Sequence, residues 1–222
     1  TSTVSEDFQT SLYWSLHDVP TSAGALALLP TASSAEEFGA LLFENDVCPL
    51  VNNIICVDKA NNLQRYIATT TPVRIGVTGS VPLAGWQAHD FELSTAAQLT
   101  VERNPEGGIS LTANNDTMGE TGEFYIHNFP THSARADRIH ELLGKKEKFN
   151  VADFCQMQLD LTDLRAGYVL PDLLSVLRAS SEPDLQLAVQ VLETWDLQAT
   201  ADSAAACLYY PFLDRFWPRK FM

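Results

Sequence analysis

The chain has 222 residues, 45% of them hydrophobic, which is enough apolar sequence for one full core with a small second lobe. Its formal net charge of −14 at pH 7 argues against nucleic acid or an anionic membrane surface as a partner. No apolar run reaches the roughly 18 residues that a membrane span needs, so no membrane insertion is expected.

The first part of the chain mixes β-like and helical patterns. Residues 11–18 predict a short strand that ends in a turn, and residues 22–29 predict a helix that Pro30 stops. Ser34 with Glu37 three residues later is typical of a capping box, so a second helix is expected to begin there.

A β-hairpin is predicted next. The β-like runs 51–57 and 63–69 are separated by Asp-Lys-Ala-Asn-Asn, whose residues favour a turn. Residues 71–108 show little periodicity and contain several prolines and glycines, which predicts a long connection over the surface. A strand at 109–113 and an irregular acidic loop over 116–132 are expected to follow.

The last third of the chain is predicted to be helical. The expected helices are one capped by Asn150, one over 164–177, one with Pro183 in its first turn, and one opened by Asp202 or Ser203. Pro171 is expected to kink or divide the second of these helices. The order of strands and helices along the chain indicates an α+β fold.

The four cysteines form no metal-binding or redox motif. Cys155 and Cys207 fall in apolar helical runs and are predicted to be buried thiols. Cys48 and Cys56 flank a predicted strand and could pair only if the chain doubles back, so both a thiol state and a disulfide stay open for them.

No self-sufficient catalytic motif is present, since the chain has no nucleophile elbow, phosphate loop or zinc-protease motif. His127 and His132 lie five residues apart in a predicted loop, which is a weak metal-binding signal. Asp116, Glu120 and Glu123 could ligate calcium, but a solvated acidic loop is favoured because their spacing lacks the EF-hand pattern.

The most informative chemistry lies in a carboxamide pair followed by an arginine. The predicted strand ends on Asn114 and Asn115, and a helix-like segment over 133–143 follows. At about 100° per residue, Arg135 is expected to point into an apolar face. That face is formed by Ala136, Ile139, Leu142 and Leu143. A neutral donor and a fixed positive charge at one point can stabilise an oxyanion. A structural arginine that caps a loop or pairs with a carboxylate is an equal alternative.

Several blocks occur in an order and spacing that together are fairly specific. They are Ala35 to Phe38, Asn52 to Leu63, Thr71 to Arg74, Pro82 to Trp86, Thr112 to Asn115, Arg135 to Leu143, Thr194 to Asp196 and Ala201 to Ala206. Together they resemble a middle segment of the β subunit of penicillin amidase-type enzymes, a group that includes penicillin G, cephalosporin and N-acyl-homoserine lactone acylases. Position 61 is asparagine where the family prefers glycine, and asparagine tolerates the left-handed conformation.

The resemblance implies an N-terminal nucleophile hydrolase fold, an αββα sandwich of antiparallel strands. Residues 1–148 would belong to the sandwich and residues 149–222 to a mainly helical part of the same domain. The family is made as a zymogen that cleaves itself and exposes an N-terminal serine, which attacks linear amides through an acyl-enzyme. Asn114 falls at the family's oxyanion-hole asparagine and Arg135 at its organising arginine. Thr1 is not expected to be the nucleophile, because the residues after it do not resemble the serine segment.

The resemblance also implies partners and ligands. The partners are the remaining acylase segments, namely the α subunit and the nucleophile-bearing part of β in a heterodimer, and a small-molecule acyl amide. That substrate class includes β-lactams and acyl-homoserine lactones. No cofactor is required. Members of the family often bind calcium, so Pro72 with Glu120 or Glu123 are weak candidates for a structural calcium site. Trp86 and Phe91 are weak candidates for the acyl pocket, with core packing favoured for both. The family's location is periplasmic or secreted.

Two other classes of function compete with this one. A catalytically inactive homologue would act as a binding or structural module and would lack activity even when whole. An unrelated helical interaction domain is the third class, and the ordered blocks disfavour it.

Overall fold

The computed structural model describes residues 2–5, 8–12, 27–44, 52–68, 73, 81–87, 92, 94, 100–116 and 132–215. The chain forms two compact units. The first comprises residues 1–112 with 116–130, and the second comprises residues 113–115 with 131–222. The predicted division of one domain at residues 148 and 149 stays a prediction. The helix expected at 133–143 groups with the C-terminal helices in the second unit.

The first unit begins with a small antiparallel pair, β1 (Ser2–Ser5) and β2 (Phe8–Thr10). The strand predicted over 11–18 is not seen at its first two residues, and its remainder lies outside the described residues. Most of the helix predicted over 22–29 lies outside the described residues, and Pro30 itself lies inside the short 3-10 helix η3 (Leu29–Thr31). The fixed φ of proline suits the first turn of a helix, where no intrahelical partner for its nitrogen is needed.

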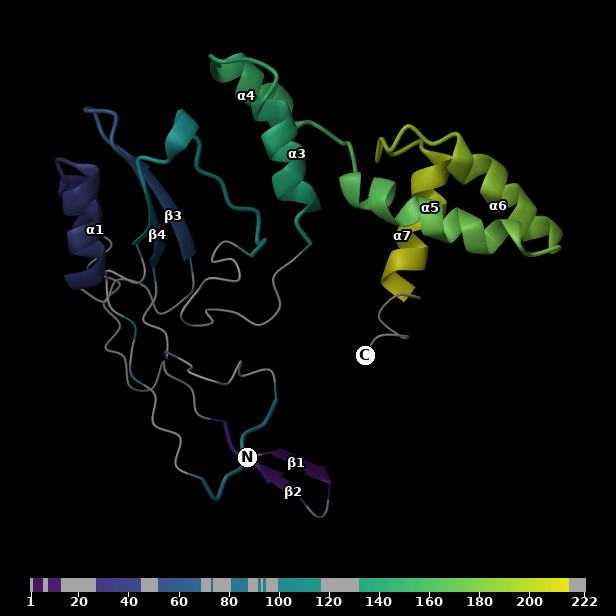
Figure 1. Ribbon diagram of the computed structural model, residues 1–222, viewed down its shortest axis with the longest axis horizontal. Coiled ribbons are helices and arrows are strands. Elements are labelled where there is room, and N and C mark those ends of the chain that lie inside the picture. Colours follow the sequence, from purple (N-terminus) through teal and green to yellow (C-terminus); the bar gives the residue numbers. More distant parts are fainter. Residues whose placement is uncertain are drawn as a thin grey trace. The chain divides into compact units, whose positions relative to one another are not determined.

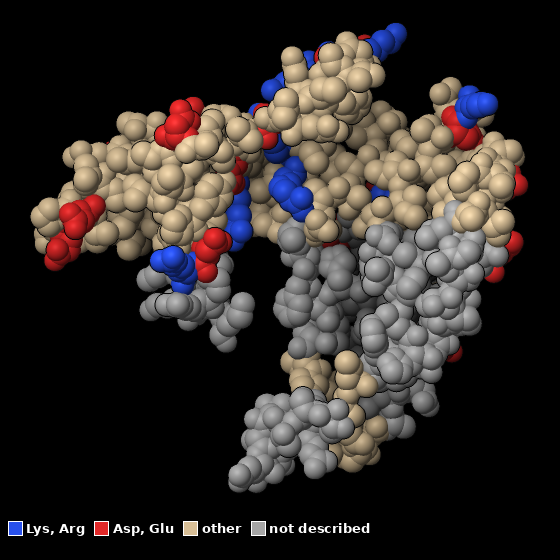
Figure 2. Space-filling model, turned by 180° about the vertical axis from the view of Figure 1, so that it is seen from behind, with Lys and Arg blue, Asp and Glu red and all other residues tan. Residues whose placement is uncertain are grey.

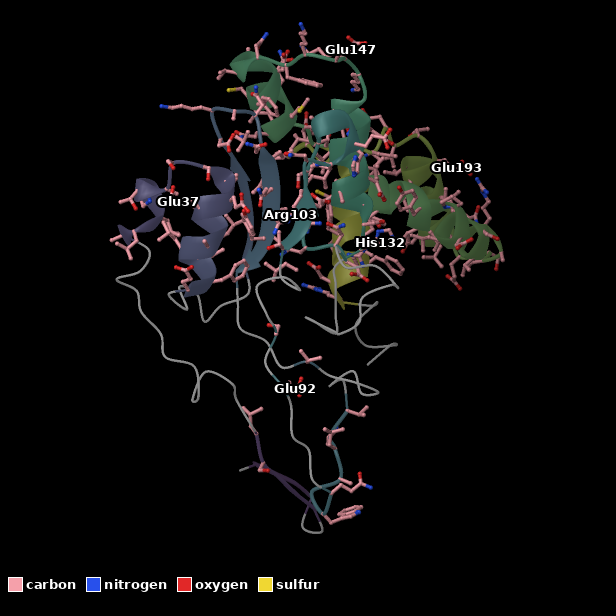
Figure 3. The ribbon with its side chains drawn as sticks, turned by 60° about the vertical axis from the view of Figure 1, so that its left-hand side comes forward. Glu37, Glu92, Arg103, His132, Glu147 and Glu193 are labelled. Atoms are coloured by element: carbon pink, nitrogen blue, oxygen red, sulfur yellow. The ribbon has the colours of Figure 1, made fainter. Side chains whose placement is uncertain are left out.

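Helix α1 (Ala35–Glu44) begins where the capping pattern predicts. Ser34 Oγ accepts a hydrogen bond from the Glu37 backbone N–H at 3.1 Å, which is one half of the expected box. The Glu37 carboxylate instead accepts from the Ser33 N–H at 2.7 Å, one residue earlier than expected. The hydrogen bonds from the Ser33 side chain and backbone lower the pKa of Glu37, which Figure 3 labels on α1.

The predicted hairpin is confirmed as β3 (Asn52–Val57) and β4 (Leu63–Ala68), which pair antiparallel. The Asp58 carboxylate organises its turn by accepting from the N–H groups of Ala60 and Asn62 at 2.8 and 2.9 Å. The same carboxylate accepts from the Ala35 N–H at 3.2 Å, which ties the turn to the start of α1. Asn61 adopts φ 65°, so asparagine does replace glycine in a left-handed turn.

A third strand, β5 (Thr100–Arg103), pairs antiparallel with β4 and gives the sheet order β3-β4-β5. It lies inside the region predicted as a long connection. The short 3-10 helix η4 (Glu106–Gly108) follows it. The strand predicted at 109–113 is wrong, because residues 109–112 form no strand and residues 113–115 form a bend.

Helix α1 lies beside β3 and β4 (Figure 1), and the contact is built on Tyr66 of β4. Tyr66 is buried, and its hydroxyl donates to the Ala35 carbonyl at 2.6 Å. Leu42 and Phe43 of α1 pack around this ring. Gly39 lies directly against the ring, so that helix and strand approach closely only because residue 39 has no side chain.

The sheet also buries a charge. Arg65 of β4 is 3% exposed, and its guanidinium bonds Glu102 of β5 at 3.0 Å and Asn53 of β3 at 3.2 Å. Burying a guanidinium is costly unless it is paired in this way. The hydrogen bond from Arg65 is the main cause that lowers the pKa of Glu102, and Ser110 also donates to this carboxylate. The ion pair therefore joins β4 to β5.

The second unit is helical, as predicted. Its helices are α3 (Ala134–Leu143), α4 (Val151–Gln158), α5 (Leu164–Arg178), α6 (Pro183–Glu193) and α7 (Ala204–Arg215). Asn150 caps α4 in a reciprocal box with Asp153, which confirms that cap. Ser203 Oγ accepts from the Ala206 N–H at 3.2 Å, so Ser203 rather than Asp202 opens α7. Helix α5 continues through Pro171 and is not divided.

Helices α5, α6 and α7 share a core (Figure 1). Its buried members recur at helical spacing along α5 and meet partners from the other two helices. They are Ala166, Leu170, Leu174, Val189, Leu192, Ala205, Tyr209 and Leu213. None of the helices among the described residues is long and apolar enough to cross a membrane.

The predicted burial of Cys155 in α4 and of Cys207 in α7 is wrong. Val151 and Leu159 are 80% and 77% exposed, and Cys155 and Cys207 are exposed thiols rather than buried ones. Apolar spacing predicts that a helix has an apolar face, but it does not say what covers that face. Cys56 is a half-buried free thiol, and Cys48 lies outside the described residues.

Candidate functional site

The site is built on a sharp turn formed by residues 113–115. Ala113 is buried, Asn114 is exposed, and Asn115 is half-buried. Asn114 adopts φ 60°, a left-handed conformation that asparagine tolerates better than most residues. The Asn115 Oδ1 atom accepts a hydrogen bond from the Ala113 N–H at 3.0 Å. The turn thus displays the Asn114 side chain at its tip.

Arg135 lies in the first turn of α3 and reaches this turn. Its Nη2 atom donates to the Ala113 carbonyl and to Asn114 Oδ1, both at 2.6 Å. The structure therefore brings together the two residues that the sequence singled out, although they are 21 positions apart.

The predicted burial of Arg135 is wrong. Arg135 is exposed, whereas its neighbours Ala134 and Ala136 are buried. A long arginine side chain can leave the helix axis and extend to a distant acceptor, so its angular position does not decide its burial. The predicted alternative of loop capping describes the Ala113 contact correctly, since that contact satisfies a backbone carbonyl.

The arginine determines which way the Asn114 carboxamide points. A guanidinium carries only donors, so the atom that faces it must be the carboxamide oxygen. Nδ2 is then directed away with its two N–H groups, and the described residues provide no acceptor for them. Within the same part of the chain, Arg135 forms no ion pair. The result is a neutral N–H donor beside a positive charge that no described carboxylate neutralises.

The start of α3 is held by a second set of polar contacts. His132, labelled in Figure 3, accepts through Nδ1 from the Ala134 N–H at 3.1 Å, and its ring packs 5.5 Å from that of Tyr168. The Asp137 carboxylate accepts from Ser133 Oγ at 2.8 Å and from the Tyr168 hydroxyl at 3.2 Å. Desolvation and the charge of Asp137 raise the pKa of Tyr168. These contacts fix the first turn of α3 against α5.

A bidentate ion pair anchors the middle of the same helix. Arg138 bonds both oxygens of Asp160, with Nε–Oδ1 at 2.9 Å and Nη2–Oδ2 at 2.7 Å. The hydrogen bond from Arg138 lowers the pKa of Asp160 to about 2. Arg138 also pairs with Glu141 one turn later at 2.8 Å. The sequence analysis missed this pair, because only the i,i+3 partner Glu141 is visible from spacing.

Of the pocket and calcium residues that the family resemblance predicts, Trp86 alone lies in the described part of the chain. Trp86 is 88% exposed, so the favoured prediction of core packing is wrong for it. Pro72, Phe91, Glu120 and Glu123 lie outside the described residues, as does His127. In the described stretches, no three His, Cys, Asp or Glu side chains are grouped to hold a metal ion.

Charged groups are dispersed over the described surface. On the face that Figure 2 shows, lysine, arginine, aspartate and glutamate lie in small groups where opposite charges often adjoin. Among the described ion pairs, Arg178 with Glu193 joins α5 to α6 at 2.5 Å. The described residues on this face form no broad basic patch of the kind that binds a polyanion.

A solved acylase structure shares the fold of this chain. A thermostable penicillin G acylase from Alcaligenes faecalis superposes with a TM-score of 0.66 at 17% identity, over 89% of this chain and 37% of that one. The chain therefore shares the fold of this acylase, and its mixture of helices with small antiparallel sheets is the α+β class that the sequence predicted.

Residues 2–222 match the model of the penicillin amidase family, and the chain belongs to that family. Penicillin acylase 2 proenzyme from Pseudomonas sp. (strain SE83) is 26% identical over 163 residues, which are 72% of this chain and 21% of that protein. The chain thus spans about a fifth of the length of this curated relative. The predicted family resemblance is confirmed.

Proposed function

We propose that this chain is a segment of an amide hydrolase that cleaves an N-acyl group from a linear amide through an acyl-enzyme. In this proposal, Asn114 donates a hydrogen bond to the developing oxyanion, and Arg135 orients Asn114 and adds positive potential. The family and the names of the similar proteins support an acylase. The nucleophile would lie on another segment of the protein.

The contact between Arg135 Nη2 and Asn114 Oδ1 at 2.6 Å carries the proposal. An oxyanion donor must be preorganised, so that it need not rotate when charge develops on the substrate. The guanidinium supplies that preorganisation, because a flipped carboxamide would bring two donors face to face. A loop-capping arginine would need only the Ala113 carbonyl, so the second bond is the one that favours the catalytic role.

Further parts of the proposal rest on the family alone. The word "proenzyme" in the relative's name supports a processed precursor, with an α subunit and a nucleophile-bearing part of β as partners. The substrate would be a small acyl amide such as a β-lactam or an acyl-homoserine lactone, and the location periplasmic or secreted. No cofactor is needed for acyl transfer of this kind. A structural calcium ion near Pro72 with Glu120 or Glu123 is likewise proposed, on residues outside the described ones.

The test uses the protein at its natural length, with a chromogenic acyl amide as substrate. Asn114→Ala and Asn114→Gly both remove the donor, and glycine also relieves the left-handed backbone. Asn114→Asp keeps an oxygen for Arg135 but has no N–H to offer. All three should lose roughly 10²–10³ in kcat, with little change in KM. Full activity in Asn114→Asp would refute the role of the carboxamide.

A simpler measurement distinguishes an active acylase from a catalytically inactive homologue. A processed acylase should show a free N-terminal serine on a companion chain, by intact mass and N-terminal sequencing. If no such serine exists and the whole protein leaves acyl amides intact, the chain is a binding or structural module.

A further inference from the structure

We infer that Asn115 is a positioning residue for the proposed reaction, acting through Asn114. Its carboxamide would hold the turn in the shape that presents the Asn114 donor. This inference rests on the proposed function, since it assigns a role within the same site.

The argument begins with how the turn is restrained. Residues 109–116, all of them described, belong to no helix or strand, so no regular ladder defines their path. Both backbone polar groups of Ala113 are hydrogen-bonded to side chains. Asn115 Oδ1 accepts from its N–H at 3.0 Å, and Arg135 Nη2 donates to its carbonyl at 2.6 Å. Short polar side chains commonly bond nearby backbone groups in this way.

Asn114 lies between these two restraints. Its φ of 60° is a conformation that costs energy for residues with a side chain, so the surrounding contacts must maintain it. The bond from Asn115 spans Asn114, because it joins the residue after Asn114 to the residue before it. Rotation of the Asn114 backbone out of the left-handed region would move Asn115 away from Ala113. The Asn115 bond and the orientation of the Asn114 donor are therefore coupled through geometry.

The arrangement assigns different tasks to two adjacent and chemically identical side chains. The Asn114 carboxamide faces Arg135 with its oxygen and is exposed, whereas the Asn115 carboxamide faces the backbone with its oxygen and is half-buried. Only the oxygen of Asn115 enters the argument. Aspartate, which has the same shape and an oxygen at that place, should replace it, whereas leucine of the same shape should not.

The experiment compares Asn115→Asp with Asn115→Leu in the natural-length protein, with a chromogenic acyl amide as substrate. Loss of one hydrogen bond that orients the donor should lower kcat of Asn115→Leu by about three- to tenfold, with KM changed less than about twofold. Asn115→Asp should keep kcat within about twofold of the parent protein. If Asn115→Leu does not yield folded protein, Asn115→Ala takes its place with the same expectation.

A double mutant separates positioning from a general structural role. In an Asn114→Ala background the donor is absent, so adding Asn115→Leu should cause no further fall in kcat. The inference would be overturned if Asn115→Leu lowered kcat as much in that background as in the parent protein. It would also be overturned if Asn115→Asp and Asn115→Leu lost kcat equally, or if Asn115→Leu lost none. If Asn114→Ala itself retained full kcat, the proposed function would fail instead, which distinguishes the two failures.

Discussion

The ion pair between Arg138 and Asp160 should determine how firmly α3, and with it Arg135, is held. The pKa of Asp160 falls from 3.8 to about 2 when the chain folds, mainly through the Arg138 hydrogen bonds. A shift of almost two units corresponds to about 2.5 kcal/mol, at 1.36 kcal/mol per unit. The two side chains are 21% and 19% exposed, and solvent screening reduces this to about 1–2 kcal/mol. We expect Asp160→Asn to destabilise α3 by that amount at pH 7.

The pH dependence follows from the direction of the shift. A carboxylate whose pKa is lower in the folded state stabilises that state above its unfolded pKa, near 3.9, and loses this effect as the pH falls through the folded value of about 2. The difference between the parent protein and Asp160→Asn should therefore be constant from about pH 5 to 7. It should fall to about half at about pH 3 and vanish only near pH 1, below both pKa values.

Amide hydrogen exchange, read by mass spectrometry on peptides from α3, measures this local stability. Asp160→Asn should reduce protection in α3 about five- to thirtyfold at pH 7, while α6 serves as an internal reference. Glu141→Gln is the matched control, because Glu141 is 50% exposed and its i,i+3 pair with Arg138 should contribute under about 0.5 kcal/mol. The reasoning would be refuted by an equal loss of protection at pH 3 and pH 7, or by an equal effect of Glu141→Gln.

Two further predictions concern the cores of the two units. In the first unit, a Cβ at residue 39 would lie 2.6 Å from Cε1 of the buried Tyr66 ring, so Gly39→Ala should lower the free energy of unfolding by about 1–3 kcal/mol. In a denaturant titration, Gly144→Ala should have a smaller effect, since its nearest atom lies at 3.3 Å; equal losses would contradict the clash. In the second unit, Asp163→Ala removes both the cap on the Ala166 N–H at 3.0 Å and the partner of the Tyr210 hydroxyl at 2.7 Å. This change should destabilise α5 by about 1–3 kcal/mol, seen as faster amide exchange in its first turn, whereas unchanged exchange there would show that the cap is dispensable.

The elements that the sequence predicted correctly are those coded by adjacent residues. The hairpin of β3 and β4 follows from two alternating runs around the turn at Asp58, and the start of α4 follows from the Asn150 cap. In each case, the residues that define the element also bond one another, so the pattern is visible within a few positions. The position of Ser34 before α1 was predictable for the same reason.

The failures involve relations between distant residues. Strand β5 is only four residues long, and its pairing depends on Arg65, which lies 37 positions before Glu102. Short strands carry little local signal, and this one was absorbed into a predicted connection. The exposure of Val151 and Cys155 depends on what covers α4, which no pattern within the helix encodes.

The candidate site was predicted in part from the sequence. Sequence spacing indicated that Asn114 and Arg135 could meet at one site, and the structure places them in hydrogen-bond contact. Sequence spacing could not show that Asn115 has its own role in the site. A side chain that bonds a backbone group two residues earlier looks the same in sequence as a solvated asparagine. The bond of Arg135 to the Ala113 carbonyl was foreseen only in general terms, as loop capping.

The left-handed asparagine at the site has a consequence for anyone who would transplant this site onto another protein. Asn61 and Asn104 adopt the same conformation, with φ of 65° and 44°, in ordinary connections of the sheet unit. A graft that reproduced only the turn would thus copy a common loop. A graft would therefore need the loop that carries Asn114 and also the start of the helix that carries Arg135. The arginine decides which end of the Asn114 carboxamide faces outward.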